Sequence, residues 1–523
     1  MTARDKRIAA RLWHRDTSLW GGDANEQASI AQRLGWLDSP QWLCDNAADL
    51  GRWAAGVKAQ GFERAVLVGM GGSSLAAEVL SQVLGPTPSG LPVLVADNTH
   101  PLAVRRLEQQ GDLAKTLFIV ASKSGHTAEV TALSAYFWDA VCKARGDAGA
   151  QFIAITDPGT PLEKLARQRG YRDCFLNPPD VGGRFAALTA FAMVPAALLG
   201  LDLSDLAGRA STMATRCRGA QLADNPGLAL GLWLGEQWQA GRGQLQLRLS
   251  PRIAPLGAWI EQLVAESTGK QGKGLLPLLA PANSEWAGGA HGVWLAVGSA
   301  RDGALWQQCD QVEKVGTPVL RLLVEDPRDL AGEFFRWEFA TATAGAVMGL
   351  NPFSEPDVNA SKEATRKLLS PSKAPSAPVA GSLAELGASL RAAPAGSYLA
   401  VLAFLPADRE AMARLQGLAG ELGDCLNLPV TVNVGPRYLH SSGQLHKGGP
   451  QKGHFLVVTA TTGWDLAIPG EAYSFGELNV AQAAGDFAVL AATGQPVFRL
   501  ALDGDPAGWV DSLSDQLRAA LLA

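Results

Sequence analysis

The sequence predicts an α/β protein with two three-layer α/β/α lobes, mainly parallel sheets, and a further α/β segment at the C-terminal side. Three observations support this fold class. From about residue 45 onward, short aliphatic and β-branched runs alternate with Gly/Ser-rich turns and helix-length segments. A helical zone from 184 to about 240 interrupts the alternation, which then resumes. A Pro/Ser-rich stretch at 370–382 separates a last portion with the same pattern.

The first lobe is predicted from five strand-like runs. They lie at 64–69, 92–97, 116–122, 151–156 and 171–176. Helix-length segments separate them, so the strands are expected to lie parallel in one sheet. The apolar run that follows, Phe185 to Leu201, is 17 residues long and is interrupted by Thr189 and Pro195. It is too short and too interrupted for a membrane span, and a buried helix is expected instead.

The second lobe and the C-terminal segment are predicted in the same way. Strands are expected at 244–249, 292–298 and 318–324, then near 398–404, 429–434 and 454–460, with helices near 407–421 and 477–491. The predicted divisions are a helical arm at 1–45, a first lobe at 46–200, a helical connection with the second lobe at 201–370, a linker at 371–383 and a C-terminal segment at 384–523.

Composition and charge exclude several classes of protein. The chain has 523 residues, of which 47% are hydrophobic and 18% charged, so disordered and fibrous classes are disfavoured. The net charge is −5 without a long basic stripe, which argues against nucleic acid as a partner. Six dispersed cysteines without a CxxC pair indicate reduced thiols in a cytosol. The charged first residues predict no signal peptide, and no membrane partner is expected.

Two hydroxyl-rich turns follow predicted neighbouring strands of the first lobe. The first is VLVGMGGSSLAAEVL, and the second, ASKSGHTAEV, offers Ser122, Lys123, Ser124 and Thr127. Hydroxyls and amides at a helix start suit a phosphate dianion, and open α/β sheets bind ligands at the carboxyl ends of strands. The alternative is an ordinary helix entry, with Ser124 or Thr127 as the cap and Glu129 after it.

Two charged residues are predicted at helix ends where their charge is unfavourable. Arg184 opens the long apolar helix, whose amino end is already positive, so it is expected to meet an anionic ligand or to pair with Asp180 or another carboxylate. Glu266 falls in the last turn of a helix that ends at Gly269. Burial and the helix end raise the pKa of such a carboxylate, which favours a proton shuttle; pairing with Lys270 is the alternative.

Other candidates carry weaker signals from the residues alone. Lys362 and Arg366 share the basic face of a predicted helix, which is typical of a solvated surface. His440 and His446 lie in a Gly-rich loop at a spacing that matches no helical metal pair, so no metal site is predicted there. His291 is the third histidine close to another candidate segment.

Taken together, these segments resemble the glucose-6-phosphate isomerase family, which is built from two sugar-isomerase (SIS) lobes. The motifs GMGGSSLA, SKSGHTAE, GGRFAALTA, ESTGKQGKG and NPFSEPDVNASK occur in the family's order between 65 and 370. The first residues and the segments RYLHSSGQLHKGGP and YSFGELNVAQAAGDF look more narrowly like the isomerase portion of transaldolase/glucose-6-phosphate isomerase fusions.

The resemblance implies a set of site residues. Gly183 and Arg184 match the positions that face the developing enediolate, Glu266 matches the base, and Lys362 matches the lysine near the ring oxygen. The residues that match phosphate-binding positions are Gly72, Ser73, Ser122, Lys123, Ser124 and Thr127.

The chain departs from the family pattern at three points. His126 stands where the family usually has Thr, and Glu355 stands where glutamine is common beside the sugar. The ring-opening histidine has no fixed spacing from the base. His291 is the best match for it, with His440 and His446 as alternatives.

The resemblance implies reversible isomerisation of glucose 6-phosphate to fructose 6-phosphate through an enediol, without a metal or organic cofactor, in a cytoplasmic homodimer. One alternative is an SIS isomerase for another sugar phosphate, such as mannose 6-phosphate. The other is a non-catalytic sugar-phosphate sensor. A sensor would need the phosphate turns but would have no use for Arg184, Glu266 and Lys362 together.

Overall fold

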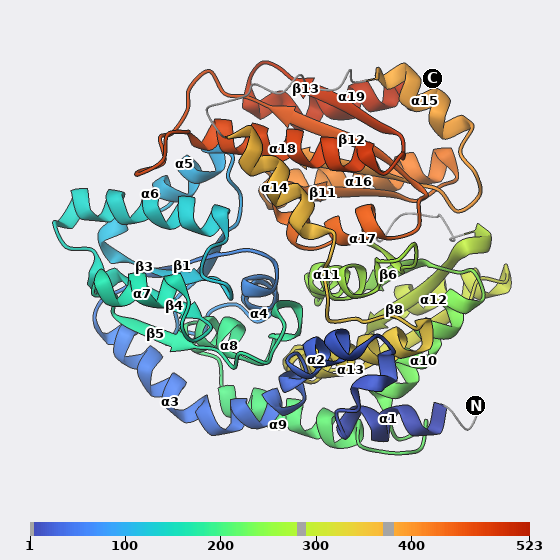
Figure 1. Cartoon of the computed structure of the whole chain (residues 1–523), viewed down its shortest axis with the longest axis horizontal. Coiled ribbons are helices and arrows are strands. Elements are labelled where there is room, and N and C mark those ends of the chain that lie inside the picture. Colours follow the sequence, from blue (N-terminus) through green and yellow to red (C-terminus); the bar gives the residue numbers. More distant parts are fainter. Residues whose placement is uncertain (1–4, 280–288, 370–380, 523) are drawn as a thin grey trace.

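Three parallel sheets form the framework of the protein (Figure 1). In each sheet, alternate residues of a central strand enter different hydrophobic cores. In the first sheet, Ala65 and Leu67 join one core, whereas Val66 and Val68 join another. Successive side chains of a strand point to opposite faces, so both faces of each sheet are buried, as the other two sheets also show. The predicted α/β class with layered parallel sheets is confirmed.

The first sheet has the strand order β2-β1-β3-β4-β5. Its strands are β1 (Arg64–Gly69), β2 (Val93–Ala96), β3 (Thr116–Ala121), β4 (Phe152–Thr156) and β5 (Asp173–Leu176). The helices between them are α4 (Leu75–Val83), α5 (Pro101–Gln109), α6 (Ala128–Arg145) and α7 (Pro161–Gln168). All five predicted strands are present. Because Gly69 pairs with Ala121 at the ends of β1 and β3, the two hydroxyl-rich turns leave the sheet at the same edge.

The second sheet has the strand order β7-β6-β8-β9. Its strands are β6 (Gln244–Leu249), β7 (Leu276–Leu279), β8 (Gly292–Gly298) and β9 (Val319–Leu323), with α11 (Leu256–Thr268) and α12 (Gly303–Lys314) between them. The sequence analysis missed β7. This strand is only four residues long and contains Pro277, which is tolerated because β7 lies at the edge of the sheet.

The third sheet has the order β11-β10-β12-β13. Its strands are β10 (Tyr398–Phe404), β11 (Val430–Val434), β12 (Gly453–Ala460) and β13 (Val497–Leu502). Its helices are α15 (Leu383–Arg391), α16 (Arg409–Leu426), α17 (Gly443–Gly448), α18 (Phe475–Ala492) and α19 (Trp509–Leu521). The two predicted helices are confirmed as α16 and α18. Strand β13, an edge strand with a partly exposed pattern, was not predicted.

Most of the further helices pack below and between the first two sheets, and one, α14, packs against α18 beside the third sheet (Figure 1). They are α1 (Asp5–Trp13), α2 (Ala24–Ala31), α3 (Ser39–Ala59), α8 (Ala190–Leu198), α9 (Leu203–Arg216), α10 (Pro226–Gln239), α13 (Leu330–Met348) and α14 (Val358–Leu368). The apolar run that was expected to form one buried helix is a helix only over α8, whose residues are all buried. The 3-10 turn η6 (Gly183–Phe185), which carries Arg184, ends at the first residue of this run, so Arg184 does not open the helix as predicted.

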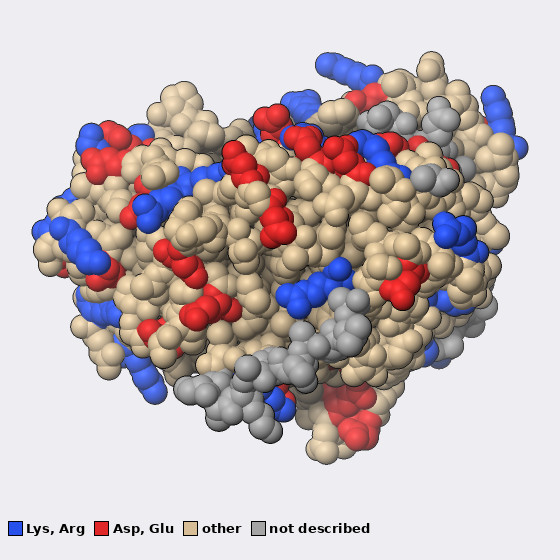
Figure 2. All heavy atoms as spheres, turned by 90° about the horizontal axis from the view of Figure 1, so that it is seen from above, with Lys and Arg blue, Asp and Glu red and all other residues tan. Residues whose placement is uncertain are grey.

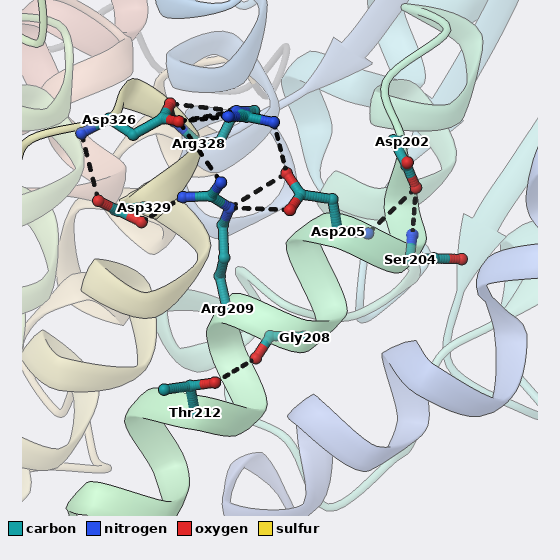
Figure 3. A network of polar contacts seen from close by, with 9 residues as sticks. All are labelled: Asp202, Ser204, Asp205, Gly208, Arg209, Thr212, Asp326, Arg328 and Asp329. Atoms are coloured by element: carbon teal, nitrogen blue, oxygen red, sulfur yellow. Dashed lines mark hydrogen bonds and ion pairs between the residues drawn. The ribbon is translucent and has the colours of Figure 1, made fainter.

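A charged network joins α9 to the start of α13 (Figure 3). Arg209 forms ion pairs with Asp205 on its own helix at 3.1 Å and with Asp329 at 2.5 Å. Asp326 caps the short turn η8 (Pro327–Asp329) that leads into α13, and it also pairs with Arg209 at 3.4 Å. The guanidinium is partly shielded from solvent, so the network fixes the relative position of the two helices more than an isolated surface pair would.

The computed structural model describes residues 5–279, 289–369 and 381–522. Most of the predicted linker, 371–380, lies outside these residues, and the division into lobes stays a prediction. Within the described residues, no helix is both long and apolar enough to cross a membrane. The six cysteines are free thiols. Figure 2 shows one face of the molecule, where acidic and basic side chains are interspersed.

Helix α13 buries a carboxyl group, Glu338, which is 0% exposed. Burial raises its pKa well above the ordinary value, and the amide of Ala187 opposes this shift only in part. Glu338 therefore binds its proton more tightly in the folded than in the unfolded protein, which makes the stability of the protein depend on pH.

Replacing Glu338 with glutamine is expected to stabilise the protein increasingly as the pH rises. Because the pKa of Glu338 is raised in the folded state, its protonated carboxyl group contributes fully to stability below the unfolded-state pKa of 4.5. This contribution is lost as the pH rises toward the folded-state pKa. The loss is about 1.4 kcal/mol per pH unit in that window. Calorimetric unfolding at about pH 5 and about pH 8 tests this, with the exposed Glu236→Gln as control. An advantage that did not grow with pH would contradict the assignment.

Candidate functional site

The turn after β1 packs directly against the turn that carries Arg184. These are η3 (Gly71–Ser73) and η6. A Cβ atom added to Gly72 would lie 2.2 Å from the carbonyl oxygen of Gly183 and 2.7 Å from the amide nitrogen of Arg184. No larger residue fits at this position. The structure therefore brings together Gly72, Ser73, Gly183 and Arg184, as the sequence analysis predicted for the site.

Arg184 is 5% exposed and contacts three segments. Its Nε donates to Ser267 Oγ at 2.8 Å, and its Nη2 donates to the carbonyl oxygens of Pro352 and Ser354 at 2.7 and 3.1 Å. Its Nη1 lies 3.2 Å from Glu266 Oε1. A buried guanidinium with this many acceptors has one fixed orientation.

A second carboxylate contacts Arg184. Glu355 Oε2 accepts from Nη1 at 2.9 Å. Burial disfavours the ionised form of Glu355, but the charges of Arg184 and Lys270 outweigh burial and lower its pKa. The salt bridge expected for Arg184 thus forms with Glu266 and Glu355, and Asp180 is not part of it. Glu355, which departs from the family pattern, thus shares the Nη1 group of Arg184 with Glu266.

Glu266 lies in the last turn of α11 and is 9% exposed. Burial raises its pKa, and the positive charge of Arg184 opposes that shift. One turn earlier, Gln262 donates its Nε2 to Glu266 Oε2 at 3.2 Å and to the carbonyl oxygen of His440 at 2.7 Å. Both oxygens of the Glu266 carboxylate are therefore positioned, one by Arg184 and one by Gln262.

Lys270 does not pair with Glu266, although the sequence left that alternative open. Its Nζ donates to the carbonyl oxygens of Asn351, at 2.9 Å, and Ser354. Burial, with a smaller contribution from the charge of Arg184, lowers its pKa to about 7. Arg184 and Lys270 both hold Ser354, so they fix the loop that presents Glu355.

The phosphate turn between β3 and α6 is only partly arranged as predicted. The hydroxyls of Ser122 and Thr127 lie 2.9 Å apart, and the Gly125 amide donates to Ser122 Oγ at 3.1 Å. Ser124 is exposed, as is His126. Lys123 forms an ion pair with Asp157 and also donates to the carbonyl oxygen of Pro179 at 3.1 Å. The hydroxyl groups are together, whereas the lysine has protein partners.

The three candidate histidines lie in very different surroundings. His291, at the start of β8, contacts the carbonyl oxygen of Gly241 at 3.1 Å and has no hydrogen bond to Arg184 or Glu266. His446 is buried against the hydroxyl of Tyr398 at 2.9 Å, and burial lowers its pKa to about 3.

His440 is the candidate that reaches the predicted site. It lies in the turn η9 (Arg437–His440), which contacts η3, and its carbonyl oxygen accepts from Gln262. Its ring Nε2 lies 3.1 Å from Glu129 Oε1. Of the candidate histidines, His440 and not His291, which was preferred from the sequence, thus contacts residues around the predicted site. It does so from a turn that follows β11 of the third sheet.

Glu129 was interpreted from the sequence as part of a helix entry, but its side chain does not cap α6. Thr127 is the N-cap residue and has no side-chain capping hydrogen bond. Burial opposes ionisation of Glu129, but His440 and the more distant Lys362 outweigh it and lower its pKa. Lys362 itself is exposed on α14. Charge therefore links Lys362 to Glu129, although no hydrogen bond joins the two within the described residues.

A pocket of about 450 Å³ lies apart from these residues. It is at the carboxyl end of β12, between the amino ends of α5 and α18. Its lining includes His100, Trp464, Glu477 and Asn479, and none of the predicted site residues lines it.

Comparison with known proteins identifies the first half of the chain. Residues 25–274 match the family model of phosphoglucose isomerase, which confirms the resemblance found from the motifs over that region. The glucose-6-phosphate isomerase of Synechococcus sp. (strain JA-3-3Ab) is 36% identical over 217 residues, 40% of each chain. That of Rubrobacter xylanophilus is 28% identical over 360 residues, 59% of this chain and 83% of its own. The chain thus spans about two fifths of the length of the first of these relatives.

Solved structures support the fold. A hypothetical protein from Thermus thermophilus has a TM-score of 0.61 and 24% identity, covering 70% of this chain and 94% of its own. A glucose-6-phosphate isomerase from Chlamydia trachomatis has a TM-score of 0.54 and 20% identity, covering 69% of this chain and 77% of its own. At these identities the likeness concerns the fold alone.

Proposed function

We propose, on the premise that residues 25–274 form a phosphoglucose isomerase region, that the chain interconverts glucose 6-phosphate and fructose 6-phosphate through an enediol. One observation supports this most directly. A buried arginine, Arg184, holds the carboxylate of Glu266 beside the turn that contains Gly72. A base and a cation fixed against each other in this way suit proton transfer next to a carbonyl group.

In this proposal Glu266 removes the proton from carbon 2 and returns it at carbon 1. Its pKa, raised by burial, favours a base that can also release the proton again. Arg184 stabilises the negative charge that develops on the enediolate oxygens. Glu355 shares Nη1 with Glu266, so the substrate must displace Glu355 or bind beside it.

The phosphate group would bind at the two turns that leave β1 and β3 at one edge of the sheet. The Ser122 and Thr127 hydroxyls form the centre of this site, and the amino end of α6 adds favourable potential. Gly72, Ser73, Lys123 and Ser124 complete the proposed set. Lys123 would keep its ion pair with Asp157 and contribute charge without direct contact. Binding the far end of the substrate orients carbons 1 and 2 toward Glu266.

We assign ring opening to His440 and Lys362, in place of His291. When the sugar ring opens, the anomeric hydroxyl loses a proton and the ring oxygen gains one. The imidazole accepts the first proton and the ammonium group supplies the second. His440 is supported by its contacts with Gln262 and Glu129. The cytoplasmic homodimer implied by the resemblance remains part of the proposal.

The proposal predicts which product the protein forms. The purified protein should convert glucose 6-phosphate to fructose 6-phosphate at least about tenfold more efficiently than it converts mannose 6-phosphate. A tenfold ratio corresponds to roughly 1.4 kcal/mol of difference in transition-state binding. Product analysis with both sugars offered side by side measures this. Preference for mannose 6-phosphate would assign another sugar phosphate, and binding without turnover would assign a sensor.

A further inference from the structure

A buried chain of hydrogen bonds runs from α18 to His440. Asn479 Nδ2 donates to Thr99 Oγ1 at 3.2 Å, and Thr99 donates to Gln482 Oε1 at 2.7 Å. Gln482 Nε2 then donates to Glu129 Oε1 at 2.7 Å, the same oxygen that His440 Nε2 contacts at 3.1 Å. Asn479, Thr99, Gln482 and Glu129 are all buried. These hydrogen bonds therefore connect α18, in the C-terminal segment, with Glu129 of α6 through buried side chains.

The ionised carboxylate of Glu129 determines which group donates and which accepts in each of these hydrogen bonds. An ionised carboxylate only accepts hydrogen bonds, so Gln482 must present its NH₂ group and His440 must present an N–H. Gln482 then has only its carbonyl oxygen for Thr99, which must donate. The oxygen of Thr99 is thereby left to accept from Asn479. These four hydrogen bonds can form together only in this one arrangement while Glu129 is ionised.

The same hydrogen bonds determine which nitrogen of the His440 imidazole carries the proton. A neutral histidine carries its proton on one nitrogen, and the hydrogen bond of that nitrogen selects which one. Here the nitrogen that faces Glu129 is Nε2. None of the described residues hydrogen-bonds Nδ1. The other charged groups that act on the ring are Glu266 and Asp97, and both do so without contact.

We propose that Asn479, Thr99 and Gln482 are positioning residues that fix His440 in the Nε2–H tautomer, so that Nδ1 is the atom that accepts a proton from the sugar. The part that concerns Nδ1 chemistry rests on the proposed isomerase function, whereas the tautomer does not. The C-terminal segment thus supplies the histidine and two of the groups that orient it, Asn479 and Gln482.

Nitrogen NMR of the full chain with ¹⁵N-labelled histidine tests the tautomer directly. The His440 signals, assigned with His440→Asn, are expected to show a protonated Nε2 and an unprotonated Nδ1 at neutral pH. In Gln482→Met, which keeps the length of the side chain but removes both polar groups, the two tautomers should become mixed. A protonated Nδ1 in the wild type, or an unchanged pattern in Gln482→Met, would overturn the proposal.

Kinetics supply the second measurement. For Gln482→Met and Thr99→Val, kcat with glucose 6-phosphate should fall about tenfold with little change in KM, because general acid–base steps depend on the protonation state of the group. Gln495→Met is a matched control, since Gln495 is also buried but donates to the carbonyl oxygen of His446. It should change neither the tautomer nor kcat. Thr99→Val keeps the test valid should Gln482→Met fold poorly.

The two proposals fail in different ways. If the wild type shows no turnover of a sugar phosphate, the proposed function is wrong, while the NMR result still decides the tautomer. If the wild type is active and both chain variants keep its kcat and pH profile, the positioning role is wrong and the function stands.

Discussion

Glu266→Gln is expected to lower kcat for glucose 6-phosphate by about 10³-fold while KM changes little, because general acid–base catalysis contributes 10²–10⁴ and the amide cannot accept the carbon 2 proton. The amide keeps the shape of the side chain, and its one oxygen can still accept from Arg184, whereas its NH₂ group replaces the oxygen that accepts from Gln262. The expected loss is therefore mainly chemical. Steady-state kinetics in both reaction directions measure it.

Glu261→Gln provides the matched control for this variant. Glu261 lies on the same helix, is buried, and accepts from Asn433 at 2.9 Å. Burial raises its pKa to about 7, so an amide resembles its protonated form. This variant should keep kcat within a few-fold of the wild type. A Glu266→Gln enzyme with a rate close to that of Glu261→Gln would remove Glu266 as the base.

Arg184→Met is expected to lower kcat/KM by about 10²–10³-fold, the usual loss when a donor to a developing oxyanion is removed. It should also shift the acidic limb of the pH profile toward higher pH. The charge of Arg184 opposes the rise that burial causes in the pKa of Glu266, so its removal raises that pKa further and leaves the base protonated at a higher pH. The pH dependence of kcat/KM measures both effects.

The control for Arg184→Met is Arg336→Met. Arg336 is a buried arginine of α13 that pairs with Glu333 at 3.2 Å. Both variants leave a buried carboxylate without its cation and should lose stability. Only Arg184→Met should shift the pH profile. An unshifted acidic limb in an active, folded Arg184→Met enzyme would show that Glu266 is not the group titrating there.

The sheets could be predicted from the sequence because the central strands are continuous runs of buried apolar residues. β1, β3 and β8 each lie between two layers and show this pattern along their whole length. β7 and β13 could not be predicted in this way. Both are edge strands, where one side needs no hydrogen-bonded partner. β7 is short and contains Pro277, and β13 is partly exposed, so their sequences carry a weaker signal.

The site could be predicted only where a local conflict marks the residue. Glu266 at a helix end is unfavourable by itself, whereas Arg184, which was expected at a helix start, lies in the turn η6 ahead of α8. Each is the other's partner. Gln262 and Lys270 give no such signal, because their partners are carbonyl oxygens far away in sequence. Glu129 fits a local capping pattern, and only the fold shows that it meets His440 from 311 positions further along.

The long sequence separation within the buried hydrogen-bond chain constrains how the protein matures during synthesis. Glu129 and Gln262 are synthesised before their partners His440 and Gln482. Until the later residues pack against them, the carboxylate and the amide must stay hydrated, since burying either without a partner costs free energy. The surroundings of Glu129 and Gln262 in the nascent chain therefore stay accessible to water until the segment that carries His440 and Gln482 folds onto them.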